Sequence, residues 1–201
     1  GAPVDYILQS DLVRQETDYK LYIMLSSFQY DDVTLAAVRR LQQKGVTILW
    51  CYAPGFIRDG VADVGNMEAL TGLRFRMDPD AACPYTTIAD TTHPITEGLA
   101  AGGFGLPFAI GPQFSVDDPE ARILGLYRDS GLASLAVKPV GQSRAAYCGS
   151  PKLPADLLRN LARFAGVHLY CEGLDTVAAN DSFILLHTAT AGSKTVHLKA
   201  K

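Results

Sequence analysis

Cys51 is the residue best placed for covalent chemistry, because it ends the apolar run 46–52, which predicts a buried strand. Strand ends of this kind present ligands and nucleophiles in α/β folds. A nucleophile elbow needs glycine two residues before and after the nucleophile, since its strained turn leaves no space for side chains. Leu49 occupies one of those positions, and Pro54-Gly55 follows where a helix is required. These neighbours favour a buried, unreactive thiol, and Cys148, at the next strand end, is no better placed.

A cysteine nucleophile also needs a base, and His93 in the segment 91–98 is the candidate. The alternative is a loop histidine whose ring bonds the backbone and fixes a turn. No second His or Cys lies at ligand spacing from it, so the sequence predicts no metal site. The glycine-rich run 102–105 does not lead from a strand into a helix, as a phosphate-binding loop must. We therefore expect no cofactor.

Aromatic side chains gather near the ends of two neighbouring predicted strands. Trp50 and Tyr52 end one strand and Phe56 follows it, and Phe28 and Tyr30 follow the other. Aromatic rings at a sheet edge can stack on sugar rings, and they can equally pack a core or an interface. The sequence leaves both interpretations open, with packing favoured.

Composition excludes several classes of protein. The 201 residues carry a formal net charge of -3, and no run of Lys or Arg forms a stripe, so nucleic acid is not an expected partner. The longest apolar run is too short to span a bilayer, so no membrane association is expected. Hydrophobic residues make up 48% of the chain, which is typical of a soluble globular protein. The sequence does not choose between the cytoplasm and secretion with a larger parent protein.

The clearest structural unit lies in residues 20–52. An apolar strand at 20–26 precedes an amphipathic helix that Asp31 or Asp32 can cap, and Gly45 ends that helix before the strand at 46–52. Strands that are apolar throughout are typical of parallel sheets buried on both faces. The pattern therefore predicts a βαβ unit with a right-handed crossover.

Other elements extend this unit on both sides. We expect an α/β fold in residues 1–166, with a flavodoxin-like parallel sheet flanked by helices, and a small antiparallel β appendage in residues 167–201. The long stretch 78–111, rich in Pro, Gly and Thr, predicts loops with little strand. The predicted strands are 4–9, 73–77, 122–127, 132–137, 143–148, 167–171, 175–178, 183–188 and 194–198, with helices near 66–70 and at 154–165.

The order of several short motifs resembles the β-galactosidase trimerisation domain and its relatives, which share the class I glutamine amidotransferase-like fold. The motifs are GAPVD at 1–5, SDL at 10–12, DYKLYI at 18–23, YAPG at 52–55, HPIT at 93–96 and AGVH at 165–168. The tail from NDSF at 180–183 to KTV at 194–196 is similar to the small β domain that follows in these glycosidases. The resemblance runs through most of the chain.

The resemblance implies a non-catalytic accessory module of a carbohydrate-active, glycoside hydrolase-type protein. In that family the catalytic carboxylates usually lie in a preceding barrel, which would be the partner here, and the amidotransferase triad is typically lost. This chain agrees, because it has no G-x-C-x-G and no His-x-Glu after the strand at 143–148. Homo-oligomerisation and a bound carbohydrate are further expectations of the resemblance.

The family pattern begins with another strand and helix before the GAPVD motif. The resemblance thus implies that residues 1–166 lack the first βα unit, which would leave an open and adhesive sheet edge. Two other functions remain open at this point. One is a small hydrolase or amidotransferase-type enzyme that uses Cys51 with His93, and the other is a sugar-binding module built on Trp50, Tyr52 and Phe56.

Overall fold

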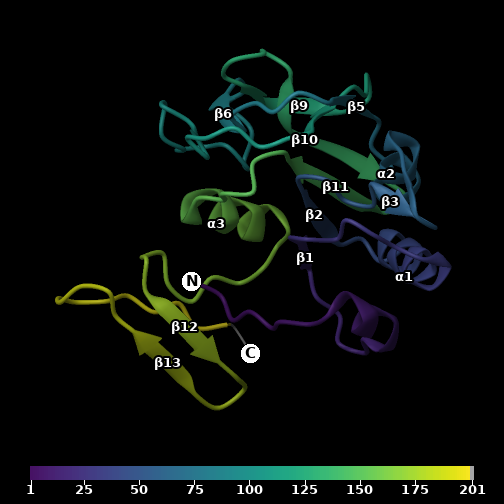
Figure 1. Ribbon diagram of the computed structural model, residues 1–201. Helices are drawn as coiled ribbons and strands as arrows, with labels where there is room; N and C mark the ends of the chain where they lie inside the picture. The colour runs from purple at the N-terminus through teal and green to yellow at the C-terminus, as the bar shows by residue number, and fades with distance from the viewer. Residues whose placement is uncertain (200–201) are drawn as a thin grey trace.

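A computed structural model of the chain describes residues 1–199 (Figure 1). The 3-10 helix is η1 Gln9–Arg14, and the α-helices are α1 Asp32–Gln42, α2 Val64–Thr71 and α3 Ala155–Phe164. The strands are β1 Leu21–Met24, β2 Thr47–Cys51, β3 Ile57–Arg58, β4 Val61–Ala62, β5 Phe75–Asp78, β6 Tyr85–Ile88, β7 Phe104–Gly105, β8 Gln113–Val116, β9 Arg122–Tyr127, β10 Ala133–Val140, β11 Ser143–Cys148, β12 Thr176–Ala179 and β13 Ile184–His187. None of the described helices has the length and apolar character that a membrane span requires.

The main sheet has seven strands in the order β1-β2-β11-β10-β9-β6-β7. The pairs β1–β2 and β2–β11 are parallel, and every later pair is antiparallel. The predicted α/β class and the βαβ unit of residues 20–52 are confirmed. The flavodoxin-like sheet is not confirmed, because the two-residue connection between β10 and β11 can join only antiparallel strands.

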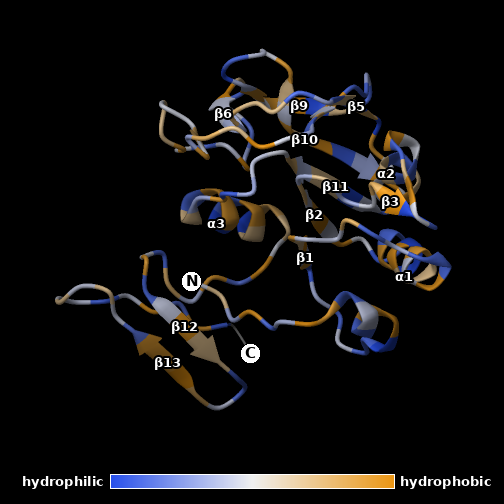
Figure 2. Cartoon of the chain, viewed as in Figure 1, coloured by the Kyte–Doolittle hydropathy of each residue, from blue (hydrophilic) through white to orange (hydrophobic). Residues whose placement is uncertain are grey.

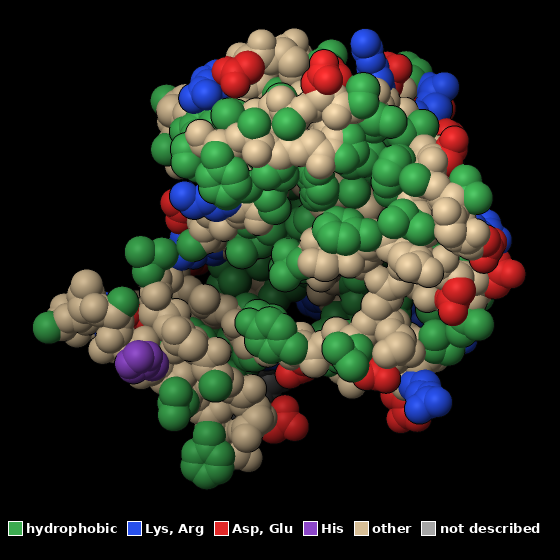
Figure 3. All heavy atoms as spheres, viewed as in Figure 1, with side chains coloured by type: hydrophobic (Ala, Val, Ile, Leu, Met, Phe, Trp, Pro, Cys, Tyr) green, Lys and Arg blue, Asp and Glu red, His purple; other side chains and the backbone are tan. Residues whose placement is uncertain are grey.

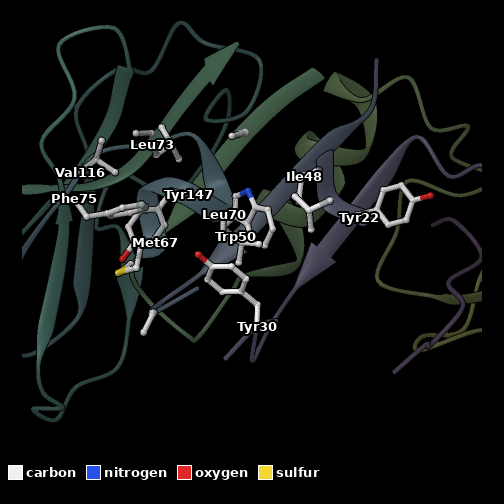
Figure 4. Packing of buried hydrophobic residues seen from close by; sticks show 14 of the residues in the cluster. Tyr22, Tyr30, Ile48, Trp50, Met67, Leu70, Leu73, Phe75, Val116 and Tyr147 are labelled. Atoms are coloured by element: carbon white, nitrogen blue, oxygen red, sulfur yellow. The ribbon is translucent and has the colours of Figure 1, made fainter. Parts of the chain in front are cut away.

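Helices cover both faces of the parallel part of the sheet (Figure 1). Successive side chains of β2 point to opposite faces, so Ile48 and Trp50 pack in the cluster that α1 joins, whereas Leu49 and Cys51 pack in the cluster that α3 joins. The helices α1 and α3 are hydrophobic toward the sheet and hydrophilic toward solvent (Figure 2). Figure 4 shows Trp50 in the middle of the first cluster, beside Leu70.

The predicted helices form where their capping residues place them. The Asp31 side chain accepts a hydrogen bond of 2.7 Å from the Thr34 amide at the start of α1. The helix predicted near 66–70 is α2, and its end at Gly72 has a φ of 80°, a left-handed conformation that glycine adopts readily. In the predicted loop stretch 78–111 only the short strands β6 and β7 form complete elements.

The N-terminal strand predicted at 4–9 does not form. Residues 1–8 belong to no strand or helix, and η1 begins at Gln9. As a result, within residues 1–199, β1 is the terminal strand of the main sheet and pairs with β2 alone.

The C-terminal residues form a hairpin of β12 and β13, in which Val177 pairs with Leu186. Its inner face packs against Tyr170 and Cys171 in a small cluster of its own. Of the four strands predicted here, those at 167–171 and 194–198 are not strands in the described part of the chain. The division of the chain after residue 166 stays a prediction.

Candidate functional site

Cys51 and the aromatic candidates lie at the carboxyl end of β2, where β1, β2 and β11 run in the same direction. This is the edge of a parallel sheet at which ligands bind in open α/β folds. Trp50 and Cys51 belong to β2, and Tyr52 follows it directly. Because side chains alternate along a strand, Trp50 and Cys51 lie on opposite faces of the sheet and cannot contribute to one surface.

Cys51 lies in an apolar environment that suppresses ionisation. It is buried under α3 and pairs in register with Cys148 on β11. Burial raises the pKa of the Cys51 thiol far above its usual value, and the neighbouring Cys148 raises it further. Burial also raises the pKa of Cys148 to about 12. Since the thiolate is the reactive form, neither side chain is prepared for nucleophilic attack at neutral pH.

His93 lies in the loop after β6, and its ring is used for structure. Its Nδ1 accepts a hydrogen bond of 3.2 Å from the Ile95 amide, and the ring packs 5.2 Å from that of Phe164. Burial lowers the pKa of His93, and the charge of Arg122 adds to this effect. No hydrogen bond joins His93 to Cys51 anywhere in residues 1–199.

The aromatic candidates differ in how much of each side chain is exposed to solvent. Trp50 is 1% exposed and packs wholly within the core, so its ring has no free face for a ligand. Tyr52 and Phe56 are half-buried. Both rings pack edge-on against buried Phe114, at 5.6 Å and 4.8 Å, and Phe28 covers Tyr52 at 6.0 Å. The arrangement is an aromatic packing cluster with Phe28 at its surface.

Tyr52, one residue beyond Cys51, adopts a strained backbone conformation. Its φ is 59°, a left-handed conformation that is unfavourable for a bulky side chain and that concentrates at functional turns. The Tyr52 amide donates to the Cys148 carbonyl at 3.0 Å. The Tyr52 hydroxyl donates to the Pro112 carbonyl at 2.7 Å, and burial raises the pKa of Tyr52. The turn at Tyr52 therefore carries a neutral phenol whose hydroxyl is already hydrogen-bonded to the backbone.

Two further tyrosines complete this network, and the sequence analysis did not identify them. The Tyr147 hydroxyl donates to the Tyr52 carbonyl at 2.7 Å and to the Phe114 carbonyl at 3.2 Å. The Tyr127 hydroxyl donates to the same Phe114 carbonyl at 2.7 Å. Both tyrosines are fully buried, and each lies within an apolar strand pattern that looks like ordinary core. They can be recognised only in the folded chain, where β9 and β11 bring their hydroxyls to the turn after β2.

The hydrogen bonds of the three tyrosines hold the end of β2 in place. In the part of the chain that the structure describes, no nucleophile is hydrogen-bonded to a base at this edge, and no group of three or more His, Cys, Asp and Glu could hold a metal ion. Each tyrosine hydroxyl donates to a backbone carbonyl. These hydrogen bonds connect the end of β2 to the loop before β8.

The structure resembles one region of known β-galactosidases. No protein family and no curated protein matches the sequence. The β-galactosidase of Bacillus circulans sp. alkalophilus matches with a TM-score of 0.59 and 16% identity over 80% of this chain and 25% of that enzyme. Gan42B, a GH42 β-galactosidase from G. stearothermophilus, matches with a TM-score of 0.58 and 16% identity over 88% of this chain and 25% of that enzyme. The chain thus spans about a quarter of the length of these enzymes.

A shorter protein has a similar fold. A putative ThuA-like protein from Bacteroides uniformis matches with a TM-score of 0.52 and 12% identity, over 78% of this chain and 73% of that protein. At such identities the likeness shows the fold alone. The expected class I glutamine amidotransferase-like fold is not confirmed by these matches, whereas the likeness to a β-galactosidase region is.

Proposed function

We propose that this chain is a non-catalytic accessory module of a carbohydrate-active protein of the glycoside hydrolase type. In that protein it lies beside a catalytic barrel and supports assembly into an oligomer. The observation that carries the proposal is the match to a quarter of several β-galactosidases, combined with a strand end that aromatic rings and tyrosine hydroxyls fill.

The chemistry of the strand end supports an accessory role. A covalent mechanism at Cys51 would need a thiolate and a base within hydrogen-bond reach. Burial holds the Cys51 thiol protonated, and the His93 ring is bonded to the Ile95 amide. Carboxylates near the sheet form salt bridges, Asp118 with Lys138 and Asp90 with Arg122.

The C-terminal hairpin supports a role in assembly. Phe183 and Leu185 expose 76% and 62% of their surface, although Leu185 lies in a strand. A two-stranded hairpin is marginally stable alone, so additional burial of its outer face would stabilise it. Exposed apolar side chains that gather on one element are typical of a surface that contacts another protein.

Sedimentation velocity over a wide concentration range tests the assembly role. We expect reversible association of the purified chain, which weakens at least about tenfold when Phe183 and Leu185 are both replaced by serine. The matched control is Val61→Ser, which removes an equally exposed side chain from β4 in another part of the surface. A wild-type chain that stays monomeric at all concentrations, or a control that weakens association equally, contradicts the assembly role.

A further inference from the structure

A small cavity lies between η1, β1 and α1, and Figure 1 shows η1 beside α1. Its volume is about 140 Å³. Four buried side chains from these three elements form its apolar walls: Leu12 from η1, Tyr22 from β1, and Ala37 and Leu41 from α1. None of them belongs to the candidate site at the end of β2, so the cavity is a separate feature of the molecule.

The Tyr22 hydroxyl in the wall of this cavity is a buried donor without an acceptor. Tyr22 is 6% exposed, and its ring packs edge-on against that of Tyr19 at 5.6 Å. Its oxygen accepts a hydrogen bond of 3.4 Å from the Tyr19 amide, but no hydrogen bond uses its own proton within residues 1–199. Figure 4 shows this hydroxyl directed away from Ile48 and the middle of the core. Since a buried donor without a partner is destabilising, an acceptor that enters the cavity would be bound there.

Two exposed cations, Arg40 and Lys44, line the mouth of the cavity, and only one of them is neutralised. Lys44 forms a salt bridge with Asp18. The Arg40 guanidinium donates to the Val13 carbonyl at 3.4 Å and forms no ion pair in the described part of the chain. The carboxyl end of α1 carries a partial negative charge of about half a unit, which the full charge of Arg40 outweighs. The mouth therefore favours a ligand with one negative charge.

The size and the surroundings of the cavity restrict the ligand further. A cavity of about 150 Å³ holds one benzene molecule, so the volume here is too small for a strand or a helix. A monosaccharide has about twice as many non-hydrogen atoms as benzene, and its hydroxyls would lie against apolar walls without partners. The chain has a net charge of -3, and Figure 3 shows acidic and basic side chains interspersed along the margin of one face. A small ligand with a single charge therefore fits better than a polyanion.

We propose that this cavity binds a small monocarboxylate whose compact apolar body has about six carbon atoms. The apolar body lies against Leu12, Ala37 and Leu41, and the carboxylate lies at the mouth. The Arg40 guanidinium binds the carboxylate through charge-assisted hydrogen bonds, and the Tyr22 hydroxyl donates its unused proton to it. This inference does not depend on the accessory role proposed above, because the cavity shares no residue with the end of β2.

Titration of the full chain with benzoate, followed by methyl NMR spectra, tests the proposal. We expect saturable shifts of the Leu12, Ala37 and Leu41 methyl signals with a Kd of about 1 mM, since so small a ligand makes few contacts. Benzamide has the same shape without the charge and should bind at least about tenfold more weakly. The compound 1-naphthoate keeps the charge but exceeds the volume of the cavity, so it should cause no shift at these methyl groups.

Two variants test the donors at the cavity, and a third serves as the control. Arg40→Gln removes the free charge at the mouth and should weaken benzoate binding at least about tenfold. Arg14→Gln removes an exposed charge of η1 that does not line the cavity, and it should leave the affinity unchanged. Tyr22→Phe removes the unused donor and should weaken binding about fivefold.

Ala37→Leu tests the cavity itself. The larger side chain enters the empty space instead of displacing packed neighbours, so this variant should lose benzoate binding without a fall in melting temperature. A variant that keeps its affinity, or that melts at a clearly lower temperature, overturns the proposal. Three results of the titrations overturn it as well: no saturable shift at about twenty times the expected Kd, equal affinity for benzamide, or an equal loss of affinity in Arg14→Gln and Arg40→Gln.

Discussion

Replacement of Tyr147 by phenylalanine tests the interpretation of the strand end as a structural joint. The Tyr147 hydroxyl is completely buried and is the partner of the Tyr52 carbonyl, to which it donates at 2.7 Å. Its removal leaves that carbonyl without a partner in the described structure. The Tyr147 hydroxyl lies wholly in the core and also donates to the Phe114 carbonyl, so its loss should lower the free energy of unfolding by about 2 kcal/mol, within the range of about 1–3 kcal/mol for a lost buried partner.

Tyr52→Phe provides the comparison. It removes the bond of 2.7 Å to the Pro112 carbonyl, but Pro112 is partly exposed and water can replace the lost donor. A loss of about 1 kcal/mol is expected, within the range for a replaceable hydrogen bond. In a chain of this size each kcal/mol lowers the melting temperature by about 2–4 °C. Tyr147→Phe should therefore lower it by about 4–8 °C, and Tyr52→Phe by about 2–4 °C.

Thermal unfolding followed by circular dichroism and calorimetry measures both effects. The control is Tyr6→Phe, whose hydroxyl belongs to a side chain that is 92% exposed, and it should leave the melting temperature unchanged. A Tyr147→Phe protein that melts within about 1 °C of the wild type would refute the reasoning. A larger effect of Tyr52→Phe than of Tyr147→Phe would refute it equally.

Two further predictions concern titratable groups. The first is alkylation of the native protein at neutral pH, with the modified residues located by mass spectrometry. We expect modification of the partly exposed Cys83 and none of Cys51 until the protein unfolds, because burial raises the pKa of Cys51. Rapid modification of Cys51 would contradict this. The second prediction concerns Asp90, because hydrogen bonds from the Thr92 hydroxyl and from Arg122 lower its pKa to about 2. The ionised Asp90 side chain therefore contributes fully to stability above its unfolded pKa of about 3.9, and this contribution is lost as the pH falls toward 2. Arg122→Gln should make unfolding stability fall less steeply between pH 4 and pH 2, and an equal slope in both proteins would count against the assignment.

Local patterns predicted the elements that local physics determines. The α1 helix was predictable because Asp31 caps it and Gly45 follows it, and the α3 helix because Pro154 and Gly166 bound a regular apolar stripe. Strand direction was not predictable in the same way. Pro139 looks like the end of a strand, yet β10 continues through it to Val140, which leaves only two residues before β11. That proline hid the hairpin of β10 and β11, at which the sheet changes from parallel to antiparallel pairing.

The candidate site was predictable in location but not in detail. The end of β2 was identified because an apolar run stops at Ala53-Pro54, and the structure places the strained turn there. The strain falls on Tyr52, one residue beyond Cys51, and no neighbouring residue type signals a positive φ. The hydroxyls of Tyr127 and Tyr147 arrive from β9 and β11, so only the folded chain brings them to the turn.

The central proposal is that this chain is a non-catalytic accessory module. The most direct test is to assay the purified chain with aryl β-galactosides and with glutamine, beside a Cys51→Ser variant. We predict no turnover above the buffer blank for either protein with any substrate. Turnover by the wild type that disappears in Cys51→Ser would contradict the claim and establish the strand end of β2 as catalytic.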